Sequence, residues 1–186
     1  WYRAMDEHII KILKMLKRKN KNKNLKILDA GCGTGGFTKK IEEFGQIYAV
    51  DINKTALNFS RNKKLKNLIN ASVTSLPFPN NYFDVVLSLD VIYHKDIHDD
   101  QVALTEMHRV LKQKGNLILR VPAFEILRGD HDIIVQTRHR YTSEELKNKM
   151  NKAGFFIKKI TYLNMLLSVI LILKRTIQKI KKSRNP

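Results

Sequence analysis

The chain has 186 residues, of which 43% are hydrophobic and 28% are charged, and its formal net charge is +18. This length and composition indicate one soluble globular domain with a sizeable core. A single cysteine excludes a disulfide framework within the chain, and no secretory signal is visible, so we expect a reducing, cytoplasmic compartment. Because the sequence begins with Trp1 and not with Met, we expect the start of the protein to precede it.

The excess positive charge lies at the two ends of the chain. Residues 1–26 carry nine Lys/Arg and two acids, and residues 146–186 carry eleven Lys/Arg and no acid. Residues 27–145 carry fifteen of each and are neutral. Two interpretations stay open: the lysines solubilise the chain, or the ends contact an anionic surface of lipid or nucleic acid.

The first predicted element is an amphipathic helix from Met5 to Lys19. Its apolar residues recur at helical spacing along one stripe, at Met5, Ile9, Ile12, Leu13 and Leu16. This helix and the polar break after it form an expected N-terminal unit, residues 1–24, which precedes the main domain, residues 25–162.

A glycine-rich turn follows the first predicted strand, which begins at Leu25. Four glycines come after Asp29, at Gly31, Gly33, Gly35 and Gly36. Helical spacing then runs from Phe37 to Phe44, so the pattern predicts the strand–turn–helix start of a nucleotide-binding unit. Glycine permits positive φ in such a turn and lets a ligand approach the backbone.

Two acids refine the expected ligand. Asp29 precedes the turn, and the glycine spacing differs from the G-x-G-x-x-G of dinucleotide sites. A carboxylate there repels a diphosphate but suits a cationic ligand. Asp51 ends a second predicted strand, where a carboxylate can accept both hydroxyls of a ribose. A ribose-bearing ligand with a positive group and no phosphate fits S-adenosylmethionine (SAM).

The segment Asp29-Ala30-Gly31-Cys32-Gly33-Thr34-Gly35 resembles the first motif of the class I SAM-dependent methyltransferases, of the bacterial small-molecule type. The likeness extends through residues 76–78, 82–86 and 108–112, and it covers roughly residues 25–162. It implies an α/β fold, a three-layer Rossmann-like sandwich with a mostly parallel sheet. Relatives usually end with one more strand, antiparallel in the sheet, which we do not find before Pro186. The alternative is a strand–turn–helix unit that binds nothing.

The remaining predicted elements alternate along the chain. Further strands are predicted at residues 47–51, 68–71, 83–89, 117–121 and 155–162. Helices are predicted at residues 54–64, 101–112 and 144–153. Thr142 or Ser143 caps the last helix, Glu145 is placed for a capping box if Thr142 is the cap, and Gly154 ends the helix.

The apolar run from Leu163 to Leu173 is eleven residues long and contains Asn164 and Ser168. Because about 20 residues are needed to cross a bilayer, we expect no span here. Residues 163–186 are instead expected to form an apolar and basic helix that packs on the body or lies on a membrane.

The resemblance implies a set of cofactor-binding residues at the strand ends. The methionine end of SAM is assigned to Asp29, Gly31, Cys32, Gly33 and Gly35. Asp51 and Ile52 are assigned to the ribose, with Ile52 packing on the adenine face. Ser72 and Val73 are assigned to adenine, although relatives usually carry an aspartate where Ser72 stands. The backbone of Leu89 is expected to accept from the amino group of the cofactor.

The methyl acceptor is expected over the ends of strands 83–89 and 117–121. Methyl transfer mainly needs alignment, and a base is required only when the nucleophile carries a proton of high pKa. Groups in this zone are Tyr93, His94, Glu125, His131, Asp132, His139 and Tyr141. We select His94 first as catalytic, with His131 and Tyr141, against the alternatives of a structural histidine and a solvated loop. We expect no metal.

The expected function is methyl transfer from SAM to a small-molecule, lipid-linked or glycan-linked acceptor, with peripheral contact to an anionic membrane at its inner face. Two alternatives stay open. The net charge suggests a nucleic-acid methyltransferase, although residues 90–93 lack the Asn/Asp-Pro-Pro-aromatic motif that holds a flipped base. The third reading is a SAM-binding module without catalysis. The oligomeric state is left open.

Overall fold

The computed structural model describes residues 2–21 and 24–163, which fold around a five-stranded parallel sheet of order β3-β2-β1-β4-β5. The strands are β1 Leu25–Ala30, β2 Gly45–Asp51, β3 Leu68–Asn70, β4 Phe83–Leu89 and β5 Leu111–Arg120. The chain order reverses at β1, which pairs with both β2 and β4. The predicted Rossmann-like α/β fold is therefore confirmed.

Helices cover both faces of the sheet. They are α1 Tyr2–Lys19, α2 Gly36–Lys40, α3 Lys54–Asn62, α4 Asp100–Val110, α5 Asp130–Ile134 and α6 Ser143–Lys152. Short 3₁₀ turns lie at η1 Glu42–Phe44 and η2 Glu125–Leu127. Asn53 caps α3, Asp99 caps α4 and Thr142 caps α6, each accepting from backbone N–H groups of the first turn.

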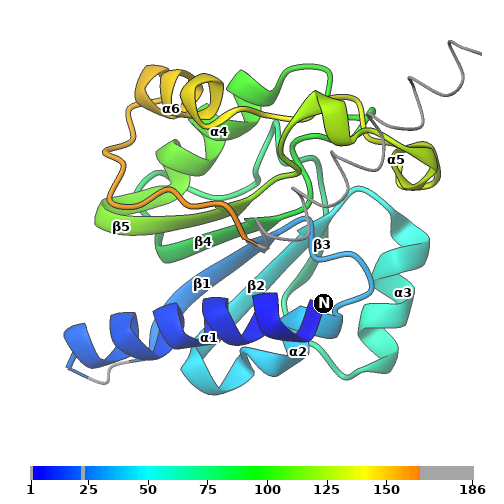
Figure 1. The fold of residues 1–186 in the computed structure, drawn as a ribbon. Coiled ribbons are helices and arrows are strands. Elements are labelled where there is room, and N and C mark those ends of the chain that lie inside the picture. The colour runs from blue at the N-terminus through cyan, green and yellow to red at the C-terminus, as the bar shows by residue number, and fades with distance from the viewer. Residues whose placement is uncertain (1, 22–23, 164–186) are drawn as a thin grey trace, which may run out of the picture.

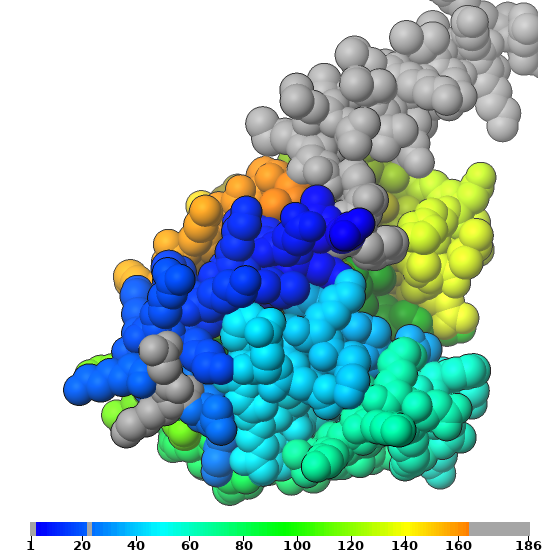
Figure 2. All heavy atoms as spheres, turned by 90° about the horizontal axis from the view of Figure 1, so that it is seen from below, coloured from blue at the N-terminus to red at the C-terminus, as the bar shows by residue number. Residues whose placement is uncertain are grey.

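Two apolar cores lie on opposite faces of the sheet and give the three layers. Ile9 and Leu13 of α1 pack with Ile27 of β1 and Leu87 of β4 on one face. Leu104 and the other buried residues of α4 pack on the other face, together with partly buried residues of α6. Figure 1 shows α1 and α2 below the sheet and α4 and α6 above it. Figure 2 shows α1, in dark blue, lying across the lower face.

The central strands are covered on both sides, as the apolar sequence of a parallel sheet requires. Five of the six residues of β1 are buried, and β4 is buried except at its second and last residues. Because β1 is the point at which the strand order reverses, a ligand crevice is expected beyond the carboxyl ends of β1 and β4. We call this side of the sheet the carboxyl edge.

Two predicted helix boundaries differ from the structure. The helix expected from Phe37 to Phe44 stops at Lys40, and a 3₁₀ turn brings Phe44 into the core. The helix expected to end at Lys112 ends at Val110, because Leu111 already pairs with Phe83 as the first residue of β5. Both differences arise where tertiary pairing overrides a local helical pattern.

The strand predicted at Phe155–Tyr162 is wrong, because the structure has no strand in this segment. The apolar residues of this segment are not buried on one side as those of a strand would be, since Phe156 is 87% exposed and Ile160 is 37% exposed. The segment is tied to β5 through a side chain instead, since Lys158 Nζ donates to Asn116 Oδ1 at 2.6 Å.

The helix predicted for residues 163–186 lies outside the described residues, apart from Leu163. Among residues 2–21 and 24–163, no helix combines the length and the apolar character needed to cross a bilayer.

Candidate functional site

The glycine turn after β1 is held by the neighbouring strand and by the turn after β4. The amides of Gly31 and Cys32 both donate to the carbonyl oxygen of Val50, at 2.8 and 3.0 Å. Gly31 has φ +91°, and a Cβ added there would lie 2.3 Å from Cγ2 of Val91. Only glycine fits at this position, because both the backbone angle and the neighbouring side chain exclude a larger residue.

The next two glycines have different surroundings. A Cβ at Gly35 would lie 2.4 Å from Cδ1 of Leu65 and 2.7 Å from Oγ of Ser60, so this glycine allows α3 to pack on the turn. Gly33 has φ +54°, and a Cβ there would meet nothing within 4 Å. The Gly33 backbone therefore borders open space, as a backbone approached by a ligand does.

Asp51, at the end of β2, is bonded to the turn itself. Its Oδ2 accepts from the amide of Gly33 at 2.7 Å, and its Oδ1 accepts from the amide of Asn53 at 2.8 Å. A carboxylate oxygen can accept a second hydrogen bond. Asp51 therefore orders the turn and keeps one acceptor position on each oxygen, which fits the two hydroxyls of a ribose.

Asp29 lies beneath the turn and is only 2% exposed. Its Oδ2 accepts from the hydroxyl of Thr38 at 2.6 Å, so one carboxylate oxygen is left for another donor. Burial raises its pKa to about 6, the Thr38 hydrogen bond opposes this, and the charge of Asp51 adds to it. The two acids therefore lie close enough to repel each other, which favours a cation between or above them.

Cys32 has the properties of a structural residue. Burial raises the pKa of its thiol to about 12, and the charges of Asp29 and Asp51 act in the same direction. A thiol with so high a pKa is not a nucleophile at neutral pH.

The residues assigned to the nucleoside lie at neighbouring strand ends. Ile52 follows β2 and is 56% exposed, as a side chain that covers an adenine face would be in the free protein. The hydroxyl of Ser72 lies 2.7 Å from that of Thr74, and the side chain of Val73 is buried in the core. Leu89 ends β4 and packs on the core with α1. The assignments of Ser72, Val73 and Leu89 stay predictions.

Arg109 supports the segment after β3, although it is not among the residues that the sequence pattern assigns to the site. Its Nη2 donates to the carbonyl oxygen of Leu76 at 2.9 Å, and its Nη1 donates to that of Phe78 at 2.8 Å. Glu106 completes the cluster by accepting from the amide of Leu76 at 2.8 Å. The segment after β3 is thereby fixed to α4.

His94, the first catalytic candidate, lies in the segment after β4. Its backbone forms an isolated antiparallel bridge with Thr137, from the segment after β5. Nδ1 lies 3.3 Å from the amide nitrogen of Asp96 and 3.4 Å from Asp96 Oδ2. Nε2 has no partner among the described residues, and it can accept a proton only in the tautomer whose Nδ1 proton faces Asp96 Oδ2.

Tyr141 is placed differently from His94. The side chain is 1% exposed, and its hydroxyl donates to Asp100 Oδ2 at 2.6 Å. Burial raises the pKa of this hydroxyl far above its usual range, and the hydrogen bond to Asp100 adds to the shift. Lys149 Nζ also bonds Asp100, at 2.8 Å. This geometry favours a structural role that joins α4, α6 and the segment after β5.

Internal ion pairs brace the segment after β5, residues 122–141. Arg140 bonds the buried carboxylate of Asp132, at 2.9 and 3.1 Å, and Arg128 bonds Glu125. His139 contacts both carboxylate oxygens of Glu145 at 2.8 Å. The predicted capping box is therefore only half present: Thr142 accepts from the Glu145 amide at 3.2 Å, but the Glu145 side chain turns to His139.

His131 is the most open of the three catalytic candidates, because it lies exposed on α5. Within residues 2–21 and 24–163, no three His, Cys, Asp or Glu side chains are arranged to hold a metal ion.

Comparison with known proteins identifies the family of this site. A family model described as a methyltransferase domain matches residues 28–119. A ubiquinone/menaquinone biosynthesis C-methyltransferase from Haemophilus ducreyi is 31% identical, over 80% of this chain and 70% of that protein. An uncharacterized protein from Methanocaldococcus jannaschii is 40% identical over 62% of this chain, but the match covers only 49% of that protein. The chain thus spans about half the length of that relative.

Solved structures agree on the fold. A SAM-dependent methyltransferase from Aquifex aeolicus superposes with a TM-score of 0.66 at 20% identity, covering 86% of this chain and 84% of that one. The magnesium protoporphyrin IX methyltransferase of Synechocystis, solved with bound SAM, gives a TM-score of 0.64 at 16% identity, covering 83% and 71%. With the glycine turn, Asp29 and Asp51 in place, the cofactor is SAM, and this chain belongs to the class I SAM-dependent methyltransferases.

Proposed function

We propose that this methyltransferase acts on a small-molecule acceptor of the quinol class. The observation that carries the proposal is the apolar surface of the segment after β5, where Ile133 and Ile134 are each 77% exposed and Ile126 is 56% exposed. Exposed apolar side chains near the carboxyl edge suit an acceptor with a large apolar part. The Haemophilus relative, which is named for ubiquinone and menaquinone biosynthesis, supports the same class.

The chemistry required of the protein is alignment and, for this acceptor class, proton removal. SAM supplies an electrophilic methyl group on a sulfonium. Attack by a ring carbon is favoured when the neighbouring phenolic oxygen has lost its proton, so a base near the acceptor assists. His94 is the proposed base through Nε2, which has no partner among the described residues; the tautomer that serves carries the ring proton on Nδ1, 3.4 Å from Asp96 Oδ2.

A panel of acceptors tests the class. The protein would be incubated with radiolabelled SAM and, in separate reactions, with a prenylated 1,4-naphthoquinol, a glycolipid extract and total RNA. We expect label in the quinol, recovered in the organic phase. Label confined to RNA or to the glycolipid would contradict the proposal.

Two histidine variants test the base. His94→Asn should lower the rate of transfer about 100-fold, the order of a lost general base, while the affinity for S-adenosylhomocysteine stays unchanged. His98→Asn is the matched control, because His98 is an exposed histidine outside the candidate set, and this variant should transfer at the normal rate. Equal rates for His94→Asn and the unchanged protein would remove His94 from the mechanism.

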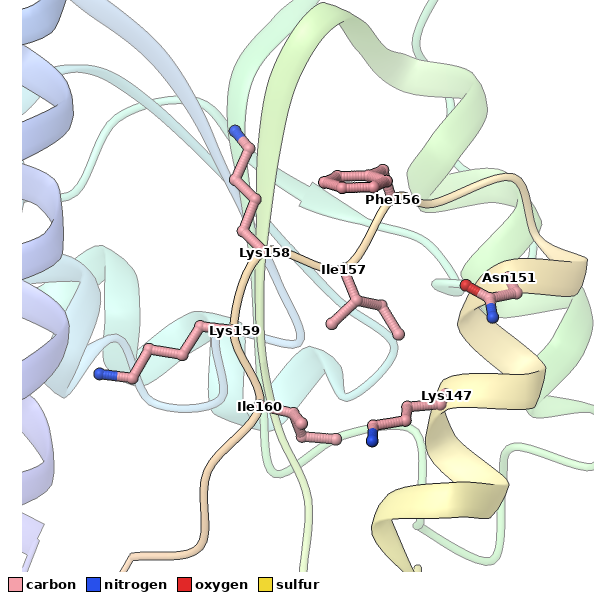
Figure 3. A pocket seen from close by; sticks show the side chains of 7 residues that line it. All are labelled: Lys147, Asn151, Phe156, Ile157, Lys158, Lys159 and Ile160. Atoms are coloured by element: carbon pink, nitrogen blue, oxygen red, sulfur yellow. The ribbon is translucent and has the colours of Figure 1, made fainter.

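We further propose that a basic and apolar hollow, remote from the glycine turn, contacts an anionic membrane. It has a volume of about 400 Å³ and is lined by Lys147 and Asn151 of α6 and by residues 156–160. Figure 3 shows Lys147 and Ile160 pointing toward each other across it, while Lys158 and Lys159 point outward. From residue 146 to residue 186 the sequence carries eleven Lys/Arg and no acid. Phe156, Ile157 and Ile160 lie among the lysines of this hollow, and apolar side chains beside basic ones suit the interface of an anionic membrane.

Vesicle sedimentation tests this contact. The double variant Lys147→Gln, Lys159→Gln should bind vesicles of mixed phosphatidylglycerol and phosphatidylcholine more weakly than the unchanged protein, most clearly at low salt. The control double variant Lys11→Gln, Lys66→Gln removes the same charge elsewhere on the surface. Equal loss in both pairs would indicate a non-specific charge effect, and tight salt-dependent binding to RNA alone would favour the nucleic-acid reading.

A further inference from the structure

The last residue of β5, Arg120, forms an ion pair at the carboxyl edge with Asp90, the residue that follows β4. Arg120 Nε and Nη2 bond Asp90 Oδ2 at 3.0 and 2.5 Å. The amide of Asp90 donates to the carbonyl oxygen of Arg120 at 3.0 Å, and Asp90 adopts φ +62°. One end of the guanidinium is therefore fixed by two contacts between neighbouring chain segments.

The other end of the same guanidinium is unsatisfied. Arg120 Nη1 is buried and has no hydrogen-bond partner among the described residues. A buried donor without a partner is unfavourable, especially on a cation, so such groups usually meet a ligand or an ordered water. The fork of an arginine suits the two oxygens of a carboxylate.

Arg120 and Asp29 lie on the same face of the sheet. Ile118 packs on the core with α1, whereas Leu117 and Leu119 pack on the core with α4, so the alternation of β5 assigns Arg120 to the α1 face. In β1, Leu28 and Ala30 belong to the α4 core, which assigns Asp29 to the α1 face as well.

The strand register fixes how far apart these two residues are. Asp29 pairs with Leu87 of β4, and Arg120 pairs with Leu89, two residues further toward the carboxyl edge. The two Cα atoms are therefore separated by about 10 Å across the strands and about 7 Å along them. Between the two Cα atoms, the side chains of Asp29 and Arg120 leave room for one ammonium group and one carboxylate, such as those of a free amino acid.

We propose that Arg120 binds an oxyanion at the methyl-transfer site, with Asp90 as the residue that positions its guanidinium. The inference rests on the membership in the SAM-dependent family and on the proposed acceptor site. Two sources can supply the oxyanion. One is the carboxylate of the methionine half of the cofactor, whose ammonium group Asp29 would then face. The other is an ionised oxygen on the acceptor.

Calorimetry with two nucleosides separates these sources from each other and from a failure of the family assignment. S-Adenosylhomocysteine carries the carboxylate, and 5′-methylthioadenosine lacks the whole amino-acid end. The unchanged protein must bind S-adenosylhomocysteine, and failure there would count against the functional site itself. In Arg120→Gln, we expect affinity for S-adenosylhomocysteine to fall about tenfold to a hundredfold and affinity for methylthioadenosine to stay unchanged, if the cofactor is the source.

A second arm tests the acceptor. On protein saturated with S-adenosylhomocysteine, 2-naphthoate should bind more tightly than its neutral isostere 2-naphthamide, and Arg120→Gln should abolish this preference if the acceptor is the source. Lys112→Gln is the matched control, because Lys112 bonds Asp84 at 2.7 Å between the same two strands at their opposite end. Arg120→Lys keeps the positive charge beside Asp90 but lacks the guanidinium. It replaces Arg120→Gln in both arms, with the same expected losses, if Arg120→Gln does not fold.

The proposal is supported by a loss of affinity for S-adenosylhomocysteine alone, or by a loss of the preference for 2-naphthoate over 2-naphthamide. Unchanged binding in both arms would overturn it, and so would an equal loss for S-adenosylhomocysteine and methylthioadenosine, which would mean that the variant only disturbs the pocket.

Discussion

The amide of Gly33 donates to Asp51 Oδ2 across 2.7 Å, and this bond joins the turn after β1 to the end of β2. The same carboxylate accepts from the amide of Asn53 through its other oxygen. The turn is therefore held in shape by the acid that is also assigned to the ribose, so the loss of one carboxylate removes both effects.

Asp51→Asn should weaken binding of S-adenosylhomocysteine at least tenfold and lower the free energy of unfolding by about 1–2 kcal/mol, because one of the two backbone donors loses its acceptor. Calorimetry and urea unfolding measure the two effects. Asn53→Ala is the control: it removes the cap of α3 at a cost of about 1 kcal/mol but keeps the backbone donor to Asp51, so affinity should hold. Normal affinity in Asp51→Asn would contradict the ribose assignment.

Gly33→Ala and Gly36→Ala form a matched pair, since an added Cβ meets nothing within 4 Å at either site. Gly33 has positive φ and borders the open space, so its alanine variant should be less stable by about 1 kcal/mol and should bind S-adenosylhomocysteine at least tenfold more weakly. Gly36 is the first residue of α2, and its alanine variant should gain a few tenths of a kcal/mol. Thermal unfolding and calorimetry check both. Equal affinity in the two variants would mean that Gly33 does not border the ligand.

The buried carboxyl of Asp29 makes stability depend on pH. Burial raises its pKa from 3.8 to about 6 in the folded protein, so the folded state holds the proton more tightly than the unfolded chain. This contribution is complete below pH 3.8 and is lost as the pH rises through about 6. Asp29→Asn removes it, and the variant should gain up to about 3 kcal/mol over the unchanged protein at pH 8 but little at pH 4.

Urea unfolding of both proteins at pH 4, 6 and 8, without cofactor, measures this difference. A gain in stability that is the same at all three pH values would show that the carboxyl of Asp29 does not titrate in this range. At pH 8 the variant should also bind S-adenosylhomocysteine more weakly, because it lacks the negative charge that we expect to face the ammonium group.

Tyr141→Phe should destabilise the fold by about 1.5–3 kcal/mol, the range for a hydrogen bond to a charged group, because Asp100 loses its hydroxyl donor while it keeps its ion pairs with Lys149 and Arg138. Methyl transfer by the folded variant should continue at a similar rate. Urea unfolding and the radiolabel assay check the two statements. A large loss of rate without loss of stability would return Tyr141 to the catalytic candidates.

The parts of the fold and of the candidate site that the sequence predicts correctly are those whose geometry is decided by residues close together in the chain. The glycine turn, Asp29 and Asp51 lie within 23 residues, and their geometry follows from strand ends and from positive φ at Gly31, Gly33 and Gly35. The same holds for β4, whose predicted bounds are those of the structure, and for Gly154, which ends α6 with φ +90°.

The features that the sequence does not predict depend on contacts between residues far apart in the chain. Arg109 contacts residues about 30 positions earlier, and no local period reports such a contact. The one available signal was that Leu76-Pro77-Phe78 and the run around Arg109 both belong to the family pattern. The strand expected after Gly154 failed for a related reason, since β propensity alone does not provide a covered face for Phe156.

Helix α4 carries none of the residues assigned to the cofactor, yet both sides of the candidate site are attached to it. Asp100 in its first turn anchors Tyr141, and Arg109 in its last turn anchors the segment after β3. Fraying at one end of this eleven-residue helix would release the segment proposed to receive the acceptor, and fraying at the other end would release the segment after β3, next to the residues assigned to adenine. The two sides of the candidate site are thus connected through one helix that carries none of the residues assigned to the cofactor.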